Sequence, residues 1–187
     1  ITIYGQEKES ATAGLARMNM VLHDCPTALI KCNGNSTLSD PQFTDETGGL
    51  KQFDFVVANP PFSLKSWNNG VYDTEGDSAT TLPSNAKDYG RFKGFGYPPN
   101  KNGDYAFLLH MIRSLKSKGK AAVILPHGVL FRGNAEAEIR KNIIKRGYIK
   151  GIIGLPANLF FGTGIPACLI LIDKEGAESR KAIFMVD

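Results

Sequence analysis

The apolar positions of this chain alternate between short runs rich in β-branched residues and longer segments with helical spacing. The short runs, which predict strands, cover residues 1–4, 27–32, 53–58, 121–125, 148–155 and 167–172. Apolar residues recur every three or four positions after Ser10, Asp104 and Asn134, which predicts three helices. Ser10 and Asp104 are expected to cap the first two, and Asn134 to open the third. The run 53–58 (FDFVVA) is typical of a strand buried on both faces of a parallel sheet.

The order of these elements is strand, helix, strand, strand, helix, strand, helix, strand, strand. This order predicts an α/β domain with an open, mostly parallel sheet and helices on both faces. The last two strands are joined by a segment without helical pattern, so we expect them to be antiparallel neighbours. Residues 151–172 carry no charge, but Pro156 and Pro166 interrupt them. We therefore interpret this stretch as strand, loop and strand of a folded core, with no membrane span.

Composition narrows the class of protein without indicating its function. The 187 residues are 42% hydrophobic and 21% charged, which is typical of one globular domain and excludes a disordered tail or a coiled coil. A net charge of +4 is too mild to indicate nucleic-acid binding, and the basic segment 113–150 is most simply a set of solvated helix faces. Three cysteines without metal-ligand or disulfide spacing predict a protein of the reducing cytoplasm. The three scattered histidines receive no role.

The strongest chemical signal is Asn59-Pro60-Pro61-Phe62, which directly follows the predicted strand 53–58. Ligands of open α/β sheets bind at the carboxyl ends of the strands. The two prolines fix the backbone, so the side chain of Asn59 and the carbonyls of Asn59 and Pro60 point in set directions. Such acceptors can receive both N–H bonds of an exocyclic amino group while Phe62 covers the face of its base. A stiff turn without chemistry is the alternative.

This motif and the blocks around it resemble the N6-adenine DNA methyltransferases, and within them the modification subunit of type I restriction-modification systems. The other blocks are residues 4–7, 15–20, 104–107, 119–122, 138–140, 155–156 and 163–166. The resemblance covers essentially all of residues 1–187. It implies a Rossmann-like methyltransferase fold and a single catalytic domain that is truncated at both ends, with its first strand upstream of Ile1.

The resemblance also implies S-adenosylmethionine as the cofactor, without a metal. Asn59, Pro60 and Phe62 would be catalytic, and Asn59 would also lie at the cofactor. Glu7 would accept hydrogen bonds from the cofactor's ribose hydroxyls. Where the family often has Gly-Asp-Thr-Leu, with Asp on the cofactor's adenine, this chain has Gly34-Asn35-Ser36-Thr37-Leu38. That contact therefore falls to Asn35 or to Ser36.

The partners implied by the resemblance are double-stranded DNA with a flipped adenine, a specificity subunit that reads the DNA sequence, and a restriction subunit. The long polar segment 63–103 is expected to meet DNA, with a flexible insertion as the alternative. Its candidate contacts are Lys65, Trp67, Lys87, Arg91, Lys93 and Lys101. The family's glycine-rich motif is expected upstream of Ile1, so the isolated chain should bind the cofactor weakly and methylate nothing.

Two other functional classes fit parts of the pattern. Methyltransferases of protein glutamine or of RNA share Asn-Pro-Pro-aromatic, although they more often have Tyr at the position of Phe62. A non-catalytic module for assembly or DNA clamping would need no complete cofactor site.

Overall fold

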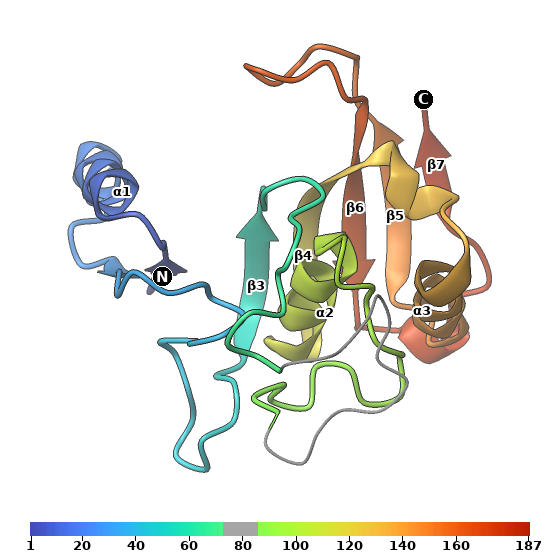
Figure 1. Ribbon diagram of the computed structural model, residues 1–187, viewed down its shortest axis with the longest axis horizontal. Helices are drawn as coiled ribbons and strands as arrows, with labels where there is room; N and C mark the ends of the chain where they lie inside the picture. The colour runs from blue at the N-terminus through green and yellow to red at the C-terminus, as the bar shows by residue number, and fades with distance from the viewer. Residues whose placement is uncertain (73–85) are drawn as a thin grey trace.

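A computed structural model of the chain describes residues 1–72 and 86–187 (Figure 1). The elements, in chain order, are β1 (Tyr4–Gln6), α1 (Ser10–Leu22), β2 (Leu29–Lys31), β3 (Phe53–Ala58), α2 (Asp104–Arg113), β4 (Leu115–Pro126), η1 (His127–Leu130), α3 (Asn134–Lys145), β5 (Ile149–Gly154), β6 (Ala167–Asp173), η2 (Ala177–Ser179) and β7 (Phe184–Val186). The predicted order of strands and helices is confirmed, and the structure adds β7, a strand that was not predicted, after the last of them.

The strands form two sheets. β1 and β2 pair in parallel in a small N-terminal sheet, against which α1 packs through β2. The larger sheet has the order β3-β4-β6-β5-β7. In it β3 is parallel to β4, β5 is parallel to β7, and β6 runs antiparallel to both β4 and β5. The expected α/β class and the antiparallel pairing of β5 with β6 are therefore confirmed.

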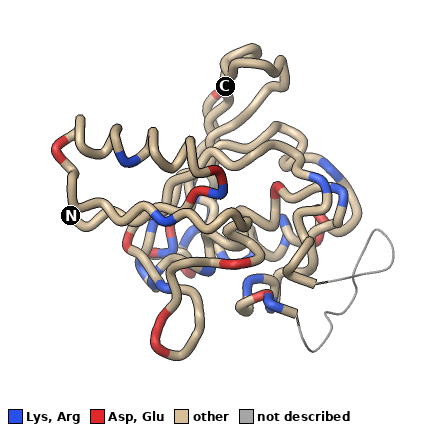
Figure 2. Tube along the Cα trace, turned by 60° about the vertical axis from the view of Figure 1, so that its left-hand side comes forward, with Lys and Arg blue, Asp and Glu red and all other residues tan. Residues whose placement is uncertain are grey.

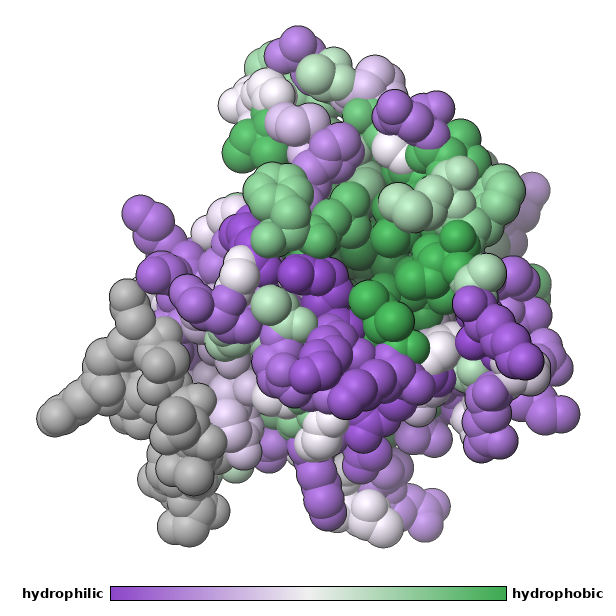
Figure 3. Space-filling view, turned by 90° about the vertical axis from the view of Figure 1, so that its right-hand side faces the viewer, coloured by the Kyte–Doolittle hydropathy of each residue, from purple (hydrophilic) through white to green (hydrophobic). Residues whose placement is uncertain are grey.

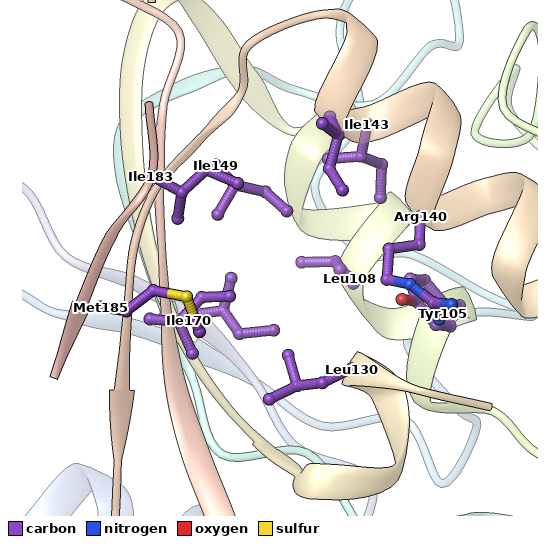
Figure 4. A pocket seen from close by; sticks show the side chains of 11 residues that line it. Tyr105, Leu108, Leu130, Arg140, Ile143, Ile149, Ile170, Ile183 and Met185 are labelled. Carbon is purple, nitrogen blue, oxygen red and sulfur yellow. The ribbon is translucent and has the colours of Figure 1, made fainter. Parts of the chain in front are cut away.

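Helices α2 and α3 lie over the same face of the larger sheet (Figures 1 and 4). The side chains of Val123, Leu125 and Ile170 on this face are almost fully buried. The prediction that β3 is buried on both faces is wrong, because Phe55 and Val57 are 74% and 79% exposed. In the described residues β3 is an edge strand, and no helix there covers its second face.

The uncharged stretch 151–172 contributes to β5, a loop and β6, as predicted. No helix in the described part of the chain is long and apolar enough to cross a membrane. Strand β4 begins at Leu115, six residues before the predicted start, and passes through Gly119. Opposite this position the pairing of β3 with β4 shifts in register between Phe53 and Phe55. The apolar pattern missed the first half of β4 because that half is rich in exposed lysine.

Candidate active site

Asn59-Pro60-Pro61-Phe62 leaves the carboxyl end of β3, as expected, with Asn59 exposed and Pro60 buried. The next residue, Ser63, has a left-handed backbone conformation with φ +51°. Two hydrogen bonds attach this loop to the start of α2. The Ser63 N–H donates to Oδ1 of Asp104 at 2.7 Å. The N–H of Gly103 donates to the carbonyl of Leu64 at 2.9 Å.

Asp104 does not cap α2 with its side chain as predicted, because its carboxylate faces the loop and a guanidinium. Asp104 is fully buried, and its Oδ2 lies 2.5 Å from Nη2 of Arg132. Arg132 also donates from Nε to Oε2 of Glu136 at 2.5 Å. Burial opposes the charge of Arg132, but the hydrogen bonds that it donates to Glu136 and Asp104 outweigh this effect and raise the pKa of the guanidinium. The carboxylate that holds the loop is thus itself held by an ion-pair network with Arg132 and Glu136.

A second aromatic ring meets Phe62 from a distant part of the chain. The rings of Phe62 and Phe160 lie 5.6 Å apart between centroids at 86°, an edge-to-face contact. Phe160 belongs to the loop between β5 and β6, which also exposes Phe161. The sequence analysis gave Phe160 no role. The available signal was an aromatic pair inside an uncharged loop that contains Gly and Pro.

Glu7 directly follows β1, which begins and ends later than the predicted strand 1–4. The backbone N–H of Glu7 donates to the carbonyl of Lys31 at 3.0 Å, so Glu7 lies beside the end of β2. Its Oε1 accepts the backbone N–H of Glu9 at 3.0 Å. In the described part of the chain, Oε2 of Glu7 makes no hydrogen bond, which leaves an acceptor at the carboxyl edge of the small sheet.

Asn35 lies in the loop after β2, at the same edge. Its Nδ2 donates to Oδ2 of Asp40 at 3.2 Å, and Nδ2 of Asn33 donates to the same oxygen at 2.6 Å. Ser36, the other residue considered, turns its Oγ towards the N–H of Leu38. The carboxylate of this loop therefore comes from Asp40, which the sequence analysis did not single out.

The predicted residues fall into two groups. Asn59, Pro60 and Phe62 share one loop at the larger sheet, whereas Glu7 and Asn35 share an edge of the small sheet. In residues 1–72 and 86–187 no hydrogen bond or ring contact joins the two groups directly. The sheets contact each other elsewhere, for example through the rings of Tyr4 and Phe53, whose centroids lie 5.3 Å apart.

Two residues of the expected DNA-binding segment are core residues instead. Trp67 is 2% exposed and donates from Nε1 to the carbonyl of Pro99, and Arg91 is 1% exposed. The prediction that these two side chains meet DNA beside the flipped base is wrong, because aromatic packing buries Trp67 and the loop backbone covers Arg91. The other four candidates, all lysines, are exposed and stay predictions. Most Lys and Arg residues lie around the larger sheet and few lie on α1 (Figure 2).

A separate apolar cavity of about 210 Å³ lies between α2, α3 and strands β5 to β7 (Figure 4). Leu108, Ile143, Ile170 and Met185 contribute to its lining, and Arg140 lies at one side. Apolar residues gather in a hollow on the corresponding face (Figure 3). Asn59 is not part of this lining, and the lining offers little polar chemistry. Within the described residues no group of three or more His, Cys, Asp or Glu could hold a metal ion.

Comparison with known proteins shows the family to which the chain belongs. A sequence model of the family described as "N-6 DNA Methylase" matches residues 1–187. The chain belongs to this family. A similar protein is the methylase subunit of the type I restriction enzyme MpnII of Mycoplasma pneumoniae. It is 34% identical over 195 residues, which cover 100% of this chain and 33% of the relative.

Solved structures support the same fold for this N-6 DNA methylase family member. A type I restriction-modification methyltransferase subunit from Streptococcus thermophilus is 36% identical, with a TM-score of 0.72 over 93% of this chain and 40% of that protein. A putative class I S-adenosylmethionine-dependent methyltransferase from Listeria monocytogenes shares the fold, with a TM-score of 0.62 at 17% identity. The match covers 97% of this chain and 48% of the Listeria protein. The fold is therefore the Rossmann-like methyltransferase fold. The chain spans about a third of the length of the curated relatives it matches.

Proposed function

We propose that the full-length protein transfers a methyl group from S-adenosylmethionine to N6 of adenine in DNA, as the modification subunit of a type I restriction-modification system. Residues 1–187 belong to its catalytic domain. The observation that carries the proposal is the loop of Asn59, Pro60 and Phe62 at the carboxyl end of β3, held by the buried carboxylate of Asp104. Membership of the N-6 DNA methylase family supports the choice of reaction.

The residues at the edge of the small sheet fit the nucleoside part of the cofactor. Glu7 would accept hydrogen bonds from the ribose hydroxyls, since one of its carboxylate oxygens has no hydrogen bond among the described residues. Asn35, held by Asp40, would contact the adenine ring. When bound, the cofactor supplies a methyl group that is electrophilic because it is attached to positively charged sulfur.

Asn59 and Pro60 would act on the amine of the target base. The N6 lone pair is conjugated into the adenine ring, which makes the amine a weak nucleophile. Hydrogen bonds from N6 to Oδ1 of Asn59 and to the carbonyl of Pro60 favour the pyramidal amine of the transition state. The carbon–sulfur bond breaks as the carbon–nitrogen bond forms, and the excess proton then leaves N6 for water. No general base is required before transfer.

Phe62 would stack on the adenine after the base has left the duplex. Its ring is held edge to face by Phe160, 5.6 Å away between centroids, so the stacking surface is set before DNA binds. The exposed Lys65, three residues after Phe62 in the long segment, would contact a phosphate beside the flipped base. A specificity subunit and a restriction subunit complete the proposed complex, in keeping with the designation of the Mycoplasma relative as a methylase subunit.

Replacement of Asn59 by Ala in the full-length protein tests the proposal. We expect single-turnover methyl transfer to fall at least about a hundredfold, because one acceptor for the amine is lost, while cofactor binding changes by only a few fold. Asn69→Ala, an exposed amide in the neighbouring turn, is the matched control and should transfer methyl groups at the wild-type rate. A wild-type rate in Asn59→Ala would overturn the catalytic assignment.

Transfer of labelled methyl groups separates the alternatives. We expect label on DNA and none on protein or RNA when the three substrates are offered to the same preparation. Label on protein glutamine or on RNA would instead identify the rival methyltransferase class. A full-length protein that labels none of the three would be a module for assembly or DNA clamping.

A further inference from the structure

A second hollow, of about 290 Å³, lies at the end of the larger sheet that is opposite Asn59. It is found where α2 and α3 end and where the chain leaves β6. Its lining is Gly90, Arg91, Lys93, Phe95, Ile112, Arg113, Arg146, Tyr148 and Lys174. We call it the basic pocket. Arg113 lies just before β4, and the first residue of β4 pairs with the first residue of β3. Asn59 follows the last residue of β3. The pocket and Asn59 are therefore separated by the six-residue length of β3, about 20 Å.

Among the described residues, the basic pocket carries more positive charge than the groups around it neutralise. Five of its nine lining residues are Arg or Lys, and none is acidic. The two helix C-termini that point at it each contribute about half a negative charge, so they offset only about one of the five. In the described part of the chain, no carboxylate forms an ion pair with any of the five cations.

Backbone carbonyls occupy only part of the hydrogen-bonding capacity of these cations. Arg146 donates from Nη1 to the Gly94 carbonyl at 2.8 Å, and Lys174 donates from Nζ to the Leu115 carbonyl at 2.9 Å. Arg113 donates from Nε to the Tyr89 carbonyl at 3.3 Å. Each guanidinium has five N–H bonds, so both exposed arginines keep donors for a further acceptor.

Arg91 forms the buried wall of the basic pocket and has donors without partners. Its Nη2 donates to the carbonyls of Leu38 and Lys87, but Nε and Nη1 are buried and have no hydrogen-bond partner. Burial lowers the pKa of Arg91 to about 10, although the nearby carboxylate of Asp88 opposes this. Burial, followed by repulsion from Arg113, lowers the pKa of Lys174 to about 8. Buried charged donors without an acceptor are costly, and Arg91 adds its positive charge to the wall of the pocket.

The loop backbone is shaped to this cluster. Gly90 and Gly94 both have left-handed backbone conformations, with φ +69° and +76°. A Cβ at Gly94 would lie 2.7 Å from Nη2 of Arg146, and a Cβ at Gly90 would lie 3.6 Å from Nη2 of Arg113. Gly94 therefore lets the loop backbone approach the Arg146 guanidinium closely, whereas a Cβ at Gly90 would make only ordinary van der Waals contact with Arg113. The pocket is a formed feature of the fold, unlike a chance group of surface lysines.

We propose that the basic pocket binds a phosphate group. A phosphate carries up to two negative charges and several strong acceptor oxygens, which match planar guanidinium donors and a lysine ammonium group. The phosphate belongs either to a DNA backbone or to a free phosphorylated small molecule. The site is separate from Asn59 and Glu7, so it does not depend on the proposed methyl transfer.

Inorganic phosphate is the first probe, added to the full-length protein at constant ionic strength with sodium chloride as the reference. We expect phosphate to raise the temperature of unfolding and to give a saturable heat of binding. In Arg146→Gln with Lys174→Gln, the concentration that gives half the effect should rise at least about tenfold. The control carries Lys118→Gln and Lys145→Gln, which remove the same charge from exposed positions outside the pocket, and should behave as wild type.

Two further measurements identify the source of the phosphate. If the source is DNA, the salt dependence of binding to a short non-target duplex should become shallower by about one in slope in the pocket variant and not in the control. If the source is a small molecule, duplex binding should stay the same while binding of a nucleoside monophosphate weakens as phosphate binding does. The proposal is overturned if phosphate has no saturable effect on wild type, or if both double variants respond equally.

Discussion

The buried carboxylate of Asp104 accepts the backbone N–H of Ser63 at 2.7 Å, across 41 positions of sequence. Ser63 follows Phe62 and has φ +51°, a left-handed conformation that costs a residue other than glycine about 1–2 kcal/mol. A loop with this conformation needs outside contacts to keep it. Asp104 supplies such a contact from the first turn of α2, and Arg132 holds the carboxylate in turn.

Asp104→Asn in the full-length protein should therefore lower methyl transfer about 10- to 100-fold, with a smaller change in cofactor affinity. The amide can still accept from Ser63, but it loses the charge opposite Arg132, a change of about 1.5–3 kcal/mol for a charged hydrogen bond. The measurements are single-turnover transfer and calorimetric cofactor binding. The matched control is Asp54→Asn, which removes an exposed carboxylate 2.9 Å from Lys116 and should change the free energy of unfolding by less than about 1 kcal/mol. Equal losses in both variants would argue against a positioning role for Asp104.

Replacing Phe62 by Leu should weaken capture of the flipped base by about 1–3 kcal/mol, the usual contribution of base stacking on an aromatic ring. Phe62→Tyr should be tolerated. Phe160→Leu should cost less, about 0.5–1.5 kcal/mol, because it removes only the edge contact with Phe62. Fluorescence of 2-aminopurine at the target position reports base flipping. Phe184→Leu, an exposed aromatic on β7, is the control, and a wild-type signal in Phe62→Leu would contradict the stacking role.

Glu7→Gln in the full-length protein should weaken binding of S-adenosylmethionine by about 10- to 100-fold, since a charged acceptor for the ribose hydroxyls is replaced by a neutral one. Calorimetry measures the affinity directly. Glu9→Gln changes an exposed carboxylate two residues away and should leave the affinity unchanged. Equal affinity of wild type and Glu7→Gln would remove Glu7 from the cofactor site.

The partly buried histidine of α2, whose Nδ1 is buried without a hydrogen-bond partner among the described residues, should make the protein less stable in mild acid. Burial, with a smaller contribution from Arg91, lowers the pKa of His110 to about 3 in the folded chain. The unfolded chain takes up this proton near pH 6.5, so the contribution of His110 to the free energy of unfolding is fully present above that pH. It should fall by up to about 1.4 kcal/mol per pH unit as the pH drops from 6.5 towards 3.

Denaturant unfolding between pH 7 and pH 4.5 measures this dependence. His110→Gln removes the titrating group, so its free energy of unfolding should fall less steeply with acid than that of wild type, whatever its value at pH 7. His23→Gln replaces an exposed histidine and should keep the wild-type slope. Identical slopes in wild type and His110→Gln would show that His110 is protonated equally in both states.

Much of the fold could be predicted because local pattern decides it. The strand Phe53–Ala58 and the helix beginning at Asn134 have the predicted start points, and the antiparallel pairing of β5 with β6 agrees with a connection that has no helical pattern. The burial of β3 could not be predicted in this way. An apolar run reports that a strand can be covered, whereas the neighbouring elements determine whether it is, and Phe55 and Val57 are exposed.

In the candidate site, too, residues that are adjacent in sequence could be predicted, whereas contacts from distant residues could not. Asn59, Pro60 and Phe62 lie within four residues of sequence, so the motif itself predicted that they share one loop. Phe160 contacts Phe62, and Arg132 pairs with the Asp104 carboxylate that holds the loop, from about 70 to 100 residues away in sequence. Asp40 accepts a hydrogen bond from Asn35, and no motif in the sequence indicated Asp40. These contacts depend on how loops cross at the sheet edge.

The sequence by itself determined the class of fold, the order of its elements and the group of acceptors at Asn59 and Pro60, because periodicity and proline geometry act over a few neighbouring residues. Only the tertiary structure decided that Trp67 and Arg91 are buried, since a charge or a ring does not report in sequence which loops will cover it. It also brought Asp104 to Ser63 and gathered Arg91, Arg113 and Arg146 into one pocket. Burial and long-range pairing depend on the packing of the whole chain, and no local pattern encodes them.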